Sequence, residues 1–423
     1  MYKKTIFDNK TRVIEVPSKE TKAVTLFFLF GVGSRYEDRS INGISHFIEH
    51  LMFKGTEKRP TTLDIAKELD SLGAEFNAMT SKDYTGYYIK IHHEKLKQAV
   101  DILSDMILNS KFDSVEIKRE KNVIVEEINM YQDNPLMHVE EILEAQVFKG
   151  HKLGQSIAGP ASTVKKITDK QILDYKNDFY RPDNLAVVAA GKIDKDFQKI
   201  IKTALIDKMV LPKCELKKFK KFTSKQSEPR ISLNYKKTKQ VQLAFGFPAF
   251  GYDDSRTYAL HLLSIILGGN MSSRLFTSVR ERQGLCYFIR CQPSFYKDTG
   301  NLYIQAGLDP SRLDSAISII LKELKKIKTK SLTARELRHA KDFLQGKITI
   351  GLEDSSHVAE YYAKQEIVAE NVMTPEEKQK KYEDVDLKQI RQVAEEVLQK
   401  NKLNMALIGP FKSKKRFDNL IKL

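Results

Sequence analysis

The sequence has few cysteines and no tryptophan. Its three cysteines, Cys214, Cys286 and Cys291, are an odd number and lack the spacing of metal ligands. This excludes a disulfide framework and a cysteine-based zinc site, both of which need paired or regularly spaced cysteines. We therefore expect the chain to work in a reducing compartment.

Long apolar runs are also missing. Residues 1–10 are polar and lack the apolar stretch of a secretory signal. No run approaches the roughly 20 apolar residues that cross a membrane. The sequence thus predicts a cytoplasmic protein with no membrane association.

Acidic residues are outnumbered, with 55 Asp and Glu against 71 Lys and Arg and a formal net charge of +16. Such a charge can steer nucleic acid, membranes or acidic substrates. The basic residues are spread widely and concentrate once, in 213–225, without the interleaved aromatics of a strand-binding groove. We therefore interpret them as a solvated surface and expect no nucleic-acid partner.

The chain contains one pattern twice. A strand-like run at 24–30 leads through glycines to Tyr-Glu-Asp at 36–38, and a similar run at 241–247 leads to Tyr-Asp-Asp at 252–254. A chain of 423 residues is also longer than a single hydrophobic core usually supports. Both observations predict two related domains.

The two halves also end alike. The helix start at 167–172 precedes a strand at 185–191, and the similar start at 385–390 precedes a strand at 403–409. This matched order strengthens the prediction of a duplicated fold.

We predict an α+β fold in which each domain is a mainly antiparallel sheet packed with helices. The expected domains are 1–211, which carries the metal site, and 230–423, with a lysine-rich linker at 212–229. Long helical patterns run over 114–131 and 333–346. We expect the domains to face each other as a clamshell, because ligand sites commonly form between domains.

A metal-binding pattern lies in the first half. His46-Phe47-Ile48-Glu49-His50 falls in a segment, 44–53, whose apolar residues and lack of proline favour a helix. One helical turn separates His46 from His50, so both imidazoles can reach one ion, and Glu49 lies about 60° from His46 at about 100° per residue. Zinc suits this set, since a catalytic zinc site takes three protein ligands and leaves one position open.

The third ligand is expected on the helix at 114–131. Glu120 and Glu127 are two turns apart, and we place Val123 and Ile124 on the same inward face, whereas Glu126 points elsewhere. Carboxylates on an apolar face are costly to bury unless they are paired or bind a metal. We therefore assign Glu127 to the metal and Glu120 to a supporting position beside it.

A pair of histidines one turn apart on a helix is often accidental, so the competing interpretation is a pair of core histidines. The two inward carboxylates on a separate helix argue against it. The remaining histidines have no matching partners, and we interpret them as structural or exposed: His92, His93, His138, His151, His261, His339 and His357.

The second half acts as an internal control. The helix pattern at 333–346 aligns with that at 114–131, which sets Ala340 opposite Glu120 and Lys347 opposite Glu127. The helix after Tyr258 also lacks the histidine motif. Only the first domain can therefore bind the metal.

The motifs together resemble the inverzincin, pitrilysin-type zinc metallopeptidases. They are HFIEH, Phe53-Lys54-Gly55-Thr56, Phe76-Asn77-Ala78-Met79-Thr80-Ser81, and the two glutamates. The similarity spans nearly the whole chain and is closest to the short processing-peptidase-like branch. The resemblance implies one Zn²⁺ per chain on His46, His50 and Glu127, with Glu49 as the catalytic base and Glu120 orienting the site.

The same resemblance gives the second domain a role. Family members carry an Arg and a Tyr seven residues apart in the metal-free domain, which reach the substrate, and Arg280 and Tyr287 match them here. The preceding segment, 268–276, also resembles the family. The range 230–423 is therefore expected to bind substrate.

Residues Phe76, Asn77 and Ala78 precede the strand-like segment 84–91. An extended peptide could pair with the edge that Phe76, Asn77 and Ala78 form. Backbone pairing selects weakly for sequence. We therefore predict an endopeptidase that takes peptides or unfolded polypeptides in extended form, in a chamber between the two domains.

Two alternatives follow from the same resemblance. Relatives that have lost their ligands serve as scaffold or core subunits, and others are processing peptidases that depend on a partner subunit. Because this chain has both an active-type first half and a substrate-type second half, we expect a homodimer.

Overall fold

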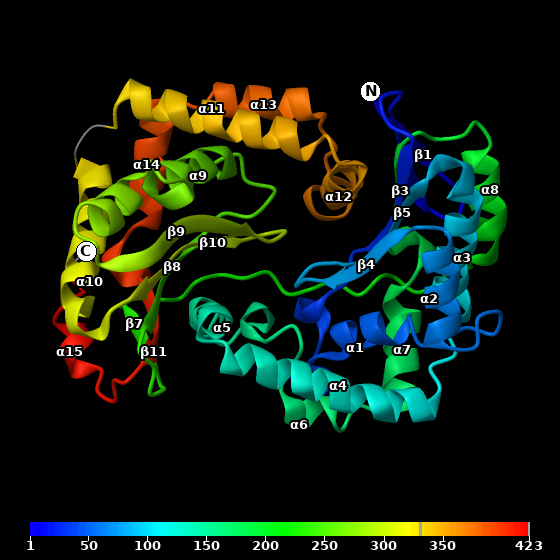
Figure 1. Cartoon of the computed structure of the whole chain (residues 1–423), viewed down its shortest axis with the longest axis horizontal. Helices are drawn as coiled ribbons and strands as arrows, with labels where there is room; N and C mark the ends of the chain where they lie inside the picture. The colour runs from blue at the N-terminus through cyan, green and yellow to red at the C-terminus, as the bar shows by residue number, and fades with distance from the viewer. Residues whose placement is uncertain (330–331, 422–423) are drawn as a thin grey trace. The chain divides into compact units, whose positions relative to one another are not determined.

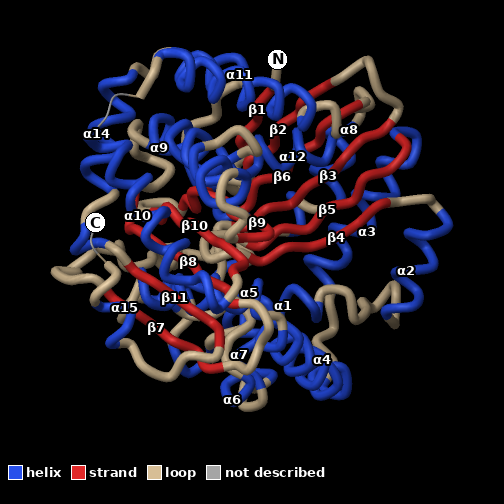
Figure 2. The backbone as a smooth tube through the Cα atoms, turned by 60° about the vertical axis from the view of Figure 1, so that its left-hand side comes forward, coloured by secondary structure: helices blue, strands red, loops and turns tan. Residues whose placement is uncertain are grey.

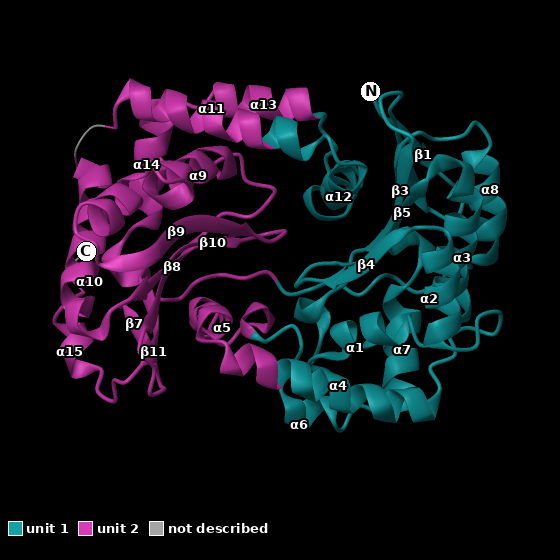
Figure 3. Cartoon of the chain, in the orientation of Figure 1, with its two compact units in different colours: residues 1–128, 155–220, 348–374 teal, residues 129–154, 221–347, 375–423 magenta. Residues whose placement is uncertain are grey.

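The computed structural model describes residues 1–329 and 332–421, and it divides into two compact units (Figure 3). Unit 1 consists of Met1–Ile128, Gln155–Lys220 and Ile348–Thr374. Unit 2 consists of Asn129–Gly154, Lys221–Lys347 and Pro375–Leu423. Neither unit is continuous in sequence.

Unit 1 is built on a six-stranded sheet with the order β1-β2-β6-β3-β5-β4. All neighbouring strands are antiparallel except the parallel pair β2 and β6. The central strands β3 and β6 are buried along almost their whole length, as expected where helices cover both faces. The strands are β1 (Lys3–Ile6), β2 (Arg12–Pro17), β3 (Ala23–Phe30), β4 (Glu75–Thr80), β5 (Thr85–His92) and β6 (Leu185–Gly191).

Helices cover both faces of this sheet. Figure 1 shows α3 on one face and α12 on the other. The hydroxyls of Thr25 on β3 and Ser355 on α12 lie 2.8 Å apart in the buried contact. The helices of unit 1 are α1 (Ile44–Leu51), α2 (Thr62–Ser71), α3 (Leu96–Asn109), most of α4 (Ser114–Asp133), α6 (Ala161–Val164), α7 (Asp169–Phe179), α8 (Phe197–Ala204) and α12 (Ser355–Lys364).

Unit 2 repeats the plan with a five-stranded sheet of order β7-β11-β8-β10-β9, seen with the first sheet in Figure 2. Its strands are β7 (Arg230–Tyr235), β8 (Val241–Ala249), β9 (Cys286–Phe295), β10 (Gly300–Leu308) and β11 (Asn404–Gly409). Its helices are α5 (Pro135–Val147), α9 (Thr257–Ser264), α10 (Leu313–Thr329), most of α11 (Ala334–Gly351), α13 (Pro375–Glu383), α14 (Leu387–Val397) and α15 (Lys415–Asp418).

The duplication predicted from the sequence is confirmed. The order β2-β6-β3-β5-β4 in unit 1 corresponds to β7-β11-β8-β10-β9 in unit 2, and the first pair is parallel in both sheets. The helices before β6 and β11 both begin with a capping box, Thr168 with Gln171 and Asp386 with Gln389. The α+β class with mainly antiparallel sheets is therefore correct. The facing arrangement of the domains stays a prediction.

The units differ from the continuous ranges 1–211 and 230–423, because each takes one segment from the other half of the sequence. Helix α5 packs on β8 and β11 of unit 2, and α12 packs on β3 and β6 of unit 1. Gly246 on β8 permits the close approach of α5, since a Cβ there would lie 3.0 Å from side-chain atoms of Leu143 and Val147. In the described part of the chain, no helix is long and apolar enough to cross a membrane.

One titratable group makes the stability of unit 2 depend on pH. His261 on α9 is half-buried, with Nδ1 3.0 Å from the Tyr382 hydroxyl. Burial, and to a smaller extent Lys378, lowers the pKa of His261 to about 4. An unfolded histidine titrates near pH 6.5, so the unfolded state gains a proton first as the pH falls. The contribution of His261 to the free energy of unfolding is therefore fully present above about pH 6.5 and is lost as the pH falls toward 4.

We expect wild type to lose about 2 kcal/mol from this group between pH 7 and pH 5, at 1.36 kcal/mol per pKa unit. His261→Phe should not show this loss. Urea unfolding of both proteins at the two pH values measures it, and the stability advantage of wild type should shrink at pH 5. If the difference in unfolding free energy between wild type and His261→Phe were the same at both pH values, the lowered pKa of His261 would be refuted.

Candidate metal centre

Helix α1 carries the histidine motif, and the buried Glu37 holds its start. Gly43 precedes the helix with φ of 103°, a conformation that favours glycine. The Glu37 carboxylate accepts hydrogen bonds from the backbone N–H groups of Gly43 at 2.7 Å and Ser45 at 2.8 Å, and from the Asn42 side chain at 2.8 Å. Burial raises the pKa of Glu37, and these donors oppose that rise. The contacts fix the helix that presents both histidines.

Three potential ligand atoms meet between α1 and α4. The Nε2 atom of His46 lies 3.6 Å from Oε2 of Glu127, and the Nε2 atom of His50 lies 3.4 Å from the same oxygen. All three side chains offer ligand atoms within 4.8 Å of one another. The structure thus brings together the three residues that the sequence predicted as ligands.

The spacing fits a zinc ion. Zinc bonds of about 2.0–2.2 Å in a tetrahedral arrangement place neighbouring ligand atoms about 3.3–3.6 Å apart. Two imidazole nitrogens and one carboxylate oxygen are also the donor types of catalytic zinc sites. Nδ1 of His46 is buried and makes no hydrogen bond within residues 1–329 and 332–421. The residues present can therefore hold zinc.

The two histidines have opposite pKa shifts. Burial, together with the neighbouring His50, lowers the pKa of His46 to about 4, which keeps this imidazole neutral. Burial also lowers the pKa of His50, but the hydrogen bonds that His50 donates to Glu120 and Glu127 outweigh it and raise that pKa to about 9. The carboxylates thus dominate the electrostatics around His50.

Glu120 supports His50 from behind. Its Oε1 atom lies 3.0 Å from Nδ1 of His50, and its Oε2 atom lies 2.7 Å from Nζ of Lys54. Although Glu120 is buried, these two partners lower its pKa. A carboxylate on the outer nitrogen of a metal-binding histidine fixes the tautomer and orientation of the ring. Glu120 stands where this role, predicted from the sequence, requires it.

Lys54 should therefore act on zinc affinity through Glu120. Lys54→Met leaves Oε2 of Glu120 without its ammonium partner, and we expect zinc affinity to fall by about 10- to 100-fold. Lys54→Arg should restore most of it. Competition with a chromogenic chelator measures the affinity. Lys58→Met is the matched control, because Lys58 is exposed and pairs with Asp101, which belongs to no metal-ligand group in the described residues. An equal loss there would contradict this role.

The carboxylate of Glu49 is half-buried and accepts a hydrogen bond from the Thr80 hydroxyl. Burial raises the pKa of Glu49, and Thr80 opposes the rise. A raised pKa suits a carboxylate that must both accept and return a proton. Thr80 is the last residue of β4, so this strand is connected directly to the candidate base.

Strand β4 is an edge strand, since β5 is its only neighbour in the sheet formed by the described residues. It contains Phe76, Asn77 and Ala78, the residues predicted to bind substrate. Their backbone edge is the kind that accepts an additional strand. The Asn77 side chain already accepts a hydrogen bond from the Ala78 N–H at 2.9 Å, so a peptide that pairs with Ala78 must replace this internal bond.

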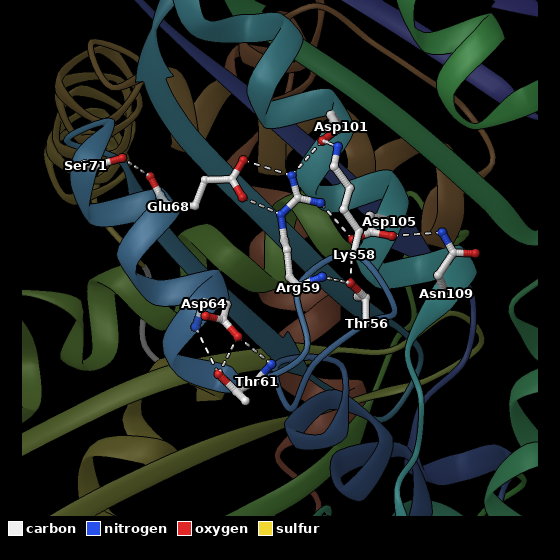
Figure 4. Close-up of polar contacts among 10 residues, drawn as sticks. All are labelled: Thr56, Lys58, Arg59, Thr61, Asp64, Glu68, Ser71, Asp101, Asp105 and Asn109. Atoms are coloured by element: carbon white, nitrogen blue, oxygen red, sulfur yellow. Dashed lines mark hydrogen bonds and ion pairs between the residues drawn. The ribbon is translucent and has the colours of Figure 1, made fainter.

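The segment after α1 is fixed by an ion cluster in which Arg59 and Asp105 are buried (Figure 4). Arg59, which is only 3% exposed, donates to both carboxylate oxygens of Glu68, at 2.6 and 2.9 Å. It also donates to Asp101 at 2.6 Å and to Asp105 at 2.7 Å, both on α3. The Thr56 hydroxyl donates to Asp105 as well, at 2.6 Å. The cluster ties the segment that follows Lys54 to two helices.

Arg280 and Tyr287 lie together in unit 2. The Arg280 guanidinium carbon is 4.7 Å from the ring centre of Phe276 and 5.8 Å from that of Tyr287. Tyr287 is 76% exposed at the start of β9. The structure therefore places both side chains on one patch, and their role in contacting substrate stays a prediction.

The prediction for α4 was wrong at one position. Val123 is 47% exposed, whereas Ile124 is fully buried. The buried face of α4 follows Glu120, Ile124 and Ile128, a four-residue step that leaves Val123 one residue out of phase. Glu126 is exposed, as expected.

Three residues that shape the centre had no role predicted from the sequence. Lys54 and Thr80 stood inside motifs that resembled the family, but only their position carried a signal. Glu37 follows the first repeated strand, and nothing in its surroundings predicts a buried carboxylate. Lys54 and Glu37 lie in loops, where periodicity is uninformative, and Thr80 ends β4, where periodicity does not identify its contact with Glu49.

Two family models match the chain. Residues 12–161 match Insulinase (Peptidase family M16), and residues 166–344 match the Peptidase M16 inactive domain. Glu37 and the whole metal centre lie in the first match, and Arg280 and Tyr287 lie in the second.

Curated relatives span the same length. The chain is 33% identical over 411 residues to a Bacillus subtilis protein named uncharacterized zinc protease YmxG, covering 97% of this chain and 98% of that protein. It is 31% identical to an uncharacterized zinc protease of Streptomyces coelicolor, covering 97% and 90%. The names of both relatives associate this sequence type with zinc.

Solved structures show the same fold. A protease from Helicobacter pylori superposes with a TM-score of 0.92 at 22% identity, covering 97% of this chain and 99% of that one. A chain of Complex III2 from Candida albicans superposes with a TM-score of 0.84 at 17% identity, covering all of both chains. With the relatives and the two family models, these results confirm the resemblance inferred from the sequence: the chain belongs to peptidase family M16.

Proposed function

We propose that this protein is a zinc-dependent endopeptidase that hydrolyses peptides or unfolded polypeptides bound in extended form. The observation that carries the proposal is the set of three ligand atoms at zinc spacing, two of them from α1, the helix that also carries the half-buried carboxylate of Glu49. Zinc held by His46, His50 and Glu127 would supply a Lewis acid that polarises the scissile carbonyl and activates water at neutral pH.

The other steps use side chains of the protein. Glu49 takes a proton from the attacking water, whose oxygen forms a bond to the carbonyl carbon. As the C–N bond breaks, Glu49 returns the proton to the leaving amine, so one carboxylate serves as base and then as acid. Thr80 holds the carboxylate in place between these steps.

Strand β4 supports the proposed substrate class. An extended peptide can add to its open edge through backbone hydrogen bonds, which read the conformation of the substrate more than its sequence. Residues within folded domains already pair with their own neighbours, so they are poor partners for this edge. The proposal therefore favours unfolded chains, with Phe76, Asn77 and Ala78 as the docking strand.

The test measures the zinc content of the purified protein and its cleavage of one polypeptide in folded and unfolded forms. We expect about one zinc per chain, cleavage mainly of the unfolded form, and loss of activity on chelation that added zinc reverses. Equal rates on both forms would contradict the substrate class. A protein that binds no zinc would overturn the proposal.

A non-catalytic role is the alternative, since the fold also occurs in a chain of Complex III2. Bound zinc without cleavage would favour this role or a peptidase that needs a partner subunit. We further propose a homodimer, which light scattering of the purified chain tests directly. A monomer that cleaves unfolded peptides would refute the dimer but not the activity.

A further inference from the structure

A second group of potential metal ligands lies at one end of the first sheet. His92 ends β5, and His93 and Glu94 continue into a short 3-10 turn. Their potential ligand atoms lie within 4.8 Å of one another. From the sequence, His92 and His93 were interpreted as structural or exposed, and the structure places Glu94 and Asp194 beside them.

The backbone around this group is well fixed. His92 pairs with Ala23 in the sheet, and the N–H of His93 donates to the carbonyl of Lys22 at 2.9 Å. The loop after β6 joins the same place, because the N–H of Lys192 donates to the carbonyl of Ala23 at 2.9 Å. Three chain segments thus converge on the two histidines.

A second carboxylate comes from that loop. Oδ1 of Asp194 lies 3.4 Å from Nδ1 of His93, and Oε2 of Glu94 lies 3.8 Å from Nδ1 of His92. A carboxylate on one imidazole nitrogen leaves the other nitrogen available and makes it a better ligand. Two imidazoles and a carboxylate form a donor set that suits divalent transition metals.

We propose that His92, His93 and Glu94 form a second site for a divalent transition-metal ion such as Zn²⁺, with Asp194 orienting His93. The site is separate from the proposed peptidase function and does not depend on it. The His92 and Glu94 side chains are 46% and 72% exposed, so small rotations can bring their atoms to bonding distance. Because these two side chains are exposed, this site is expected to bind zinc with lower affinity than the centre formed by α1 and α4.

The test titrates zinc into the metal-depleted full-length protein and measures bound metal by equilibrium dialysis. Wild type is expected to bind two ions per chain, the second at least about tenfold more weakly than the first. The reason is that two ligands of the second site, His92 and Glu94, are exposed and are not held by buried hydrogen-bonding partners. The double variant His92→Asn, His93→Asn should bind only the first. His339→Asn, an exposed histidine outside any ligand group in the described residues, should still bind two.

The outcomes separate this proposal from the proposed function. Wild type that binds a single zinc that the double variant keeps, or a double variant that keeps the weaker of two ions, would overturn the second site. Loss of the tighter ion in Glu127→Gln with the weaker ion retained would support both sites. Circular dichroism confirms that the variants remain folded.

Discussion

Glu49→Gln is expected to lower kcat/KM for peptide cleavage by about 10²- to 10⁴-fold, the contribution of a positioned general base. Glutamine can keep the hydrogen bond with Thr80 but cannot take a proton from water. Because His46, His50 and Glu127 are unchanged, zinc content should remain that of wild type. Metal analysis and cleavage of a fluorogenic peptide, measured on the same samples, check both statements.

Glu126→Gln is the matched control. Glu126 lies next to Glu127 on α4, but it is exposed and belongs to no ligand group in the described residues. The same chemical change there should leave both zinc content and kcat/KM near wild type. Full activity in Glu49→Gln would show that another group transfers the proton, even if zinc is bound.

Arg59→Met is expected to destabilise unit 1 by about 3–5 kcal/mol, the usual cost of removing one partner from a buried ion pair, here Arg59 with Asp105. Methionine fills a similar volume but leaves Asp105, which is buried, without its guanidinium partner. Glu68 and Asp101 lose contacts as well. Urea unfolding followed by circular dichroism measures the change, and the transition should move to a lower urea concentration.

Arg119→Met serves as the control for Arg59→Met. Arg119 pairs with Glu116 on the exposed surface of α4, so its removal should cost at most about 1 kcal/mol. A similarly small change for Arg59→Met would mean that water replaces the guanidinium in the cluster. In that case the cluster would not fix the segment between α1 and α2.

Periodicity and repetition predicted much of this fold. The strand expected at 185–191 coincides with β6, and the helix expected at 114–131 differs from α4 only at its last residues. Helices of this length and buried central strands carry strong patterns, because their faces are determined by burial. The proximity of His46 and His50 was also predictable, since a one-turn spacing on a helix makes two residues neighbours in space.

Other features depend on contacts that no local pattern encodes. Thr80 reaches Glu49 because β4 ends beside α1, and Lys54 reaches Glu120 from a loop. Val123 appeared to belong to the buried face because adjacent residues on a helix differ by only about 100°. The spacing of apolar residues shows how wide the buried face of a helix is, but it does not locate the middle of that face to within one residue.

The amphipathic pattern also cannot say which sheet a helix covers. Helices α5 and α12 each have a buried stripe, and an apolar stripe fits either of two related sheets. The choice depends on details such as Gly246, which makes room for α5, and Ser355, which meets Thr25. The continuous domain ranges predicted from the sequence, 1–211 and 230–423, therefore separate each of these helices from the sheet that it covers.

This exchange of helices has a consequence for how the chain can be divided. A cut near residue 220 would produce two fragments, but the first would carry α5 without its sheet, and the second would carry α12 without its sheet. Each fragment alone would leave one sheet face open to water. Expressed together, the two fragments should reassemble through these reciprocal helices, so a split gene could still yield one folded protein.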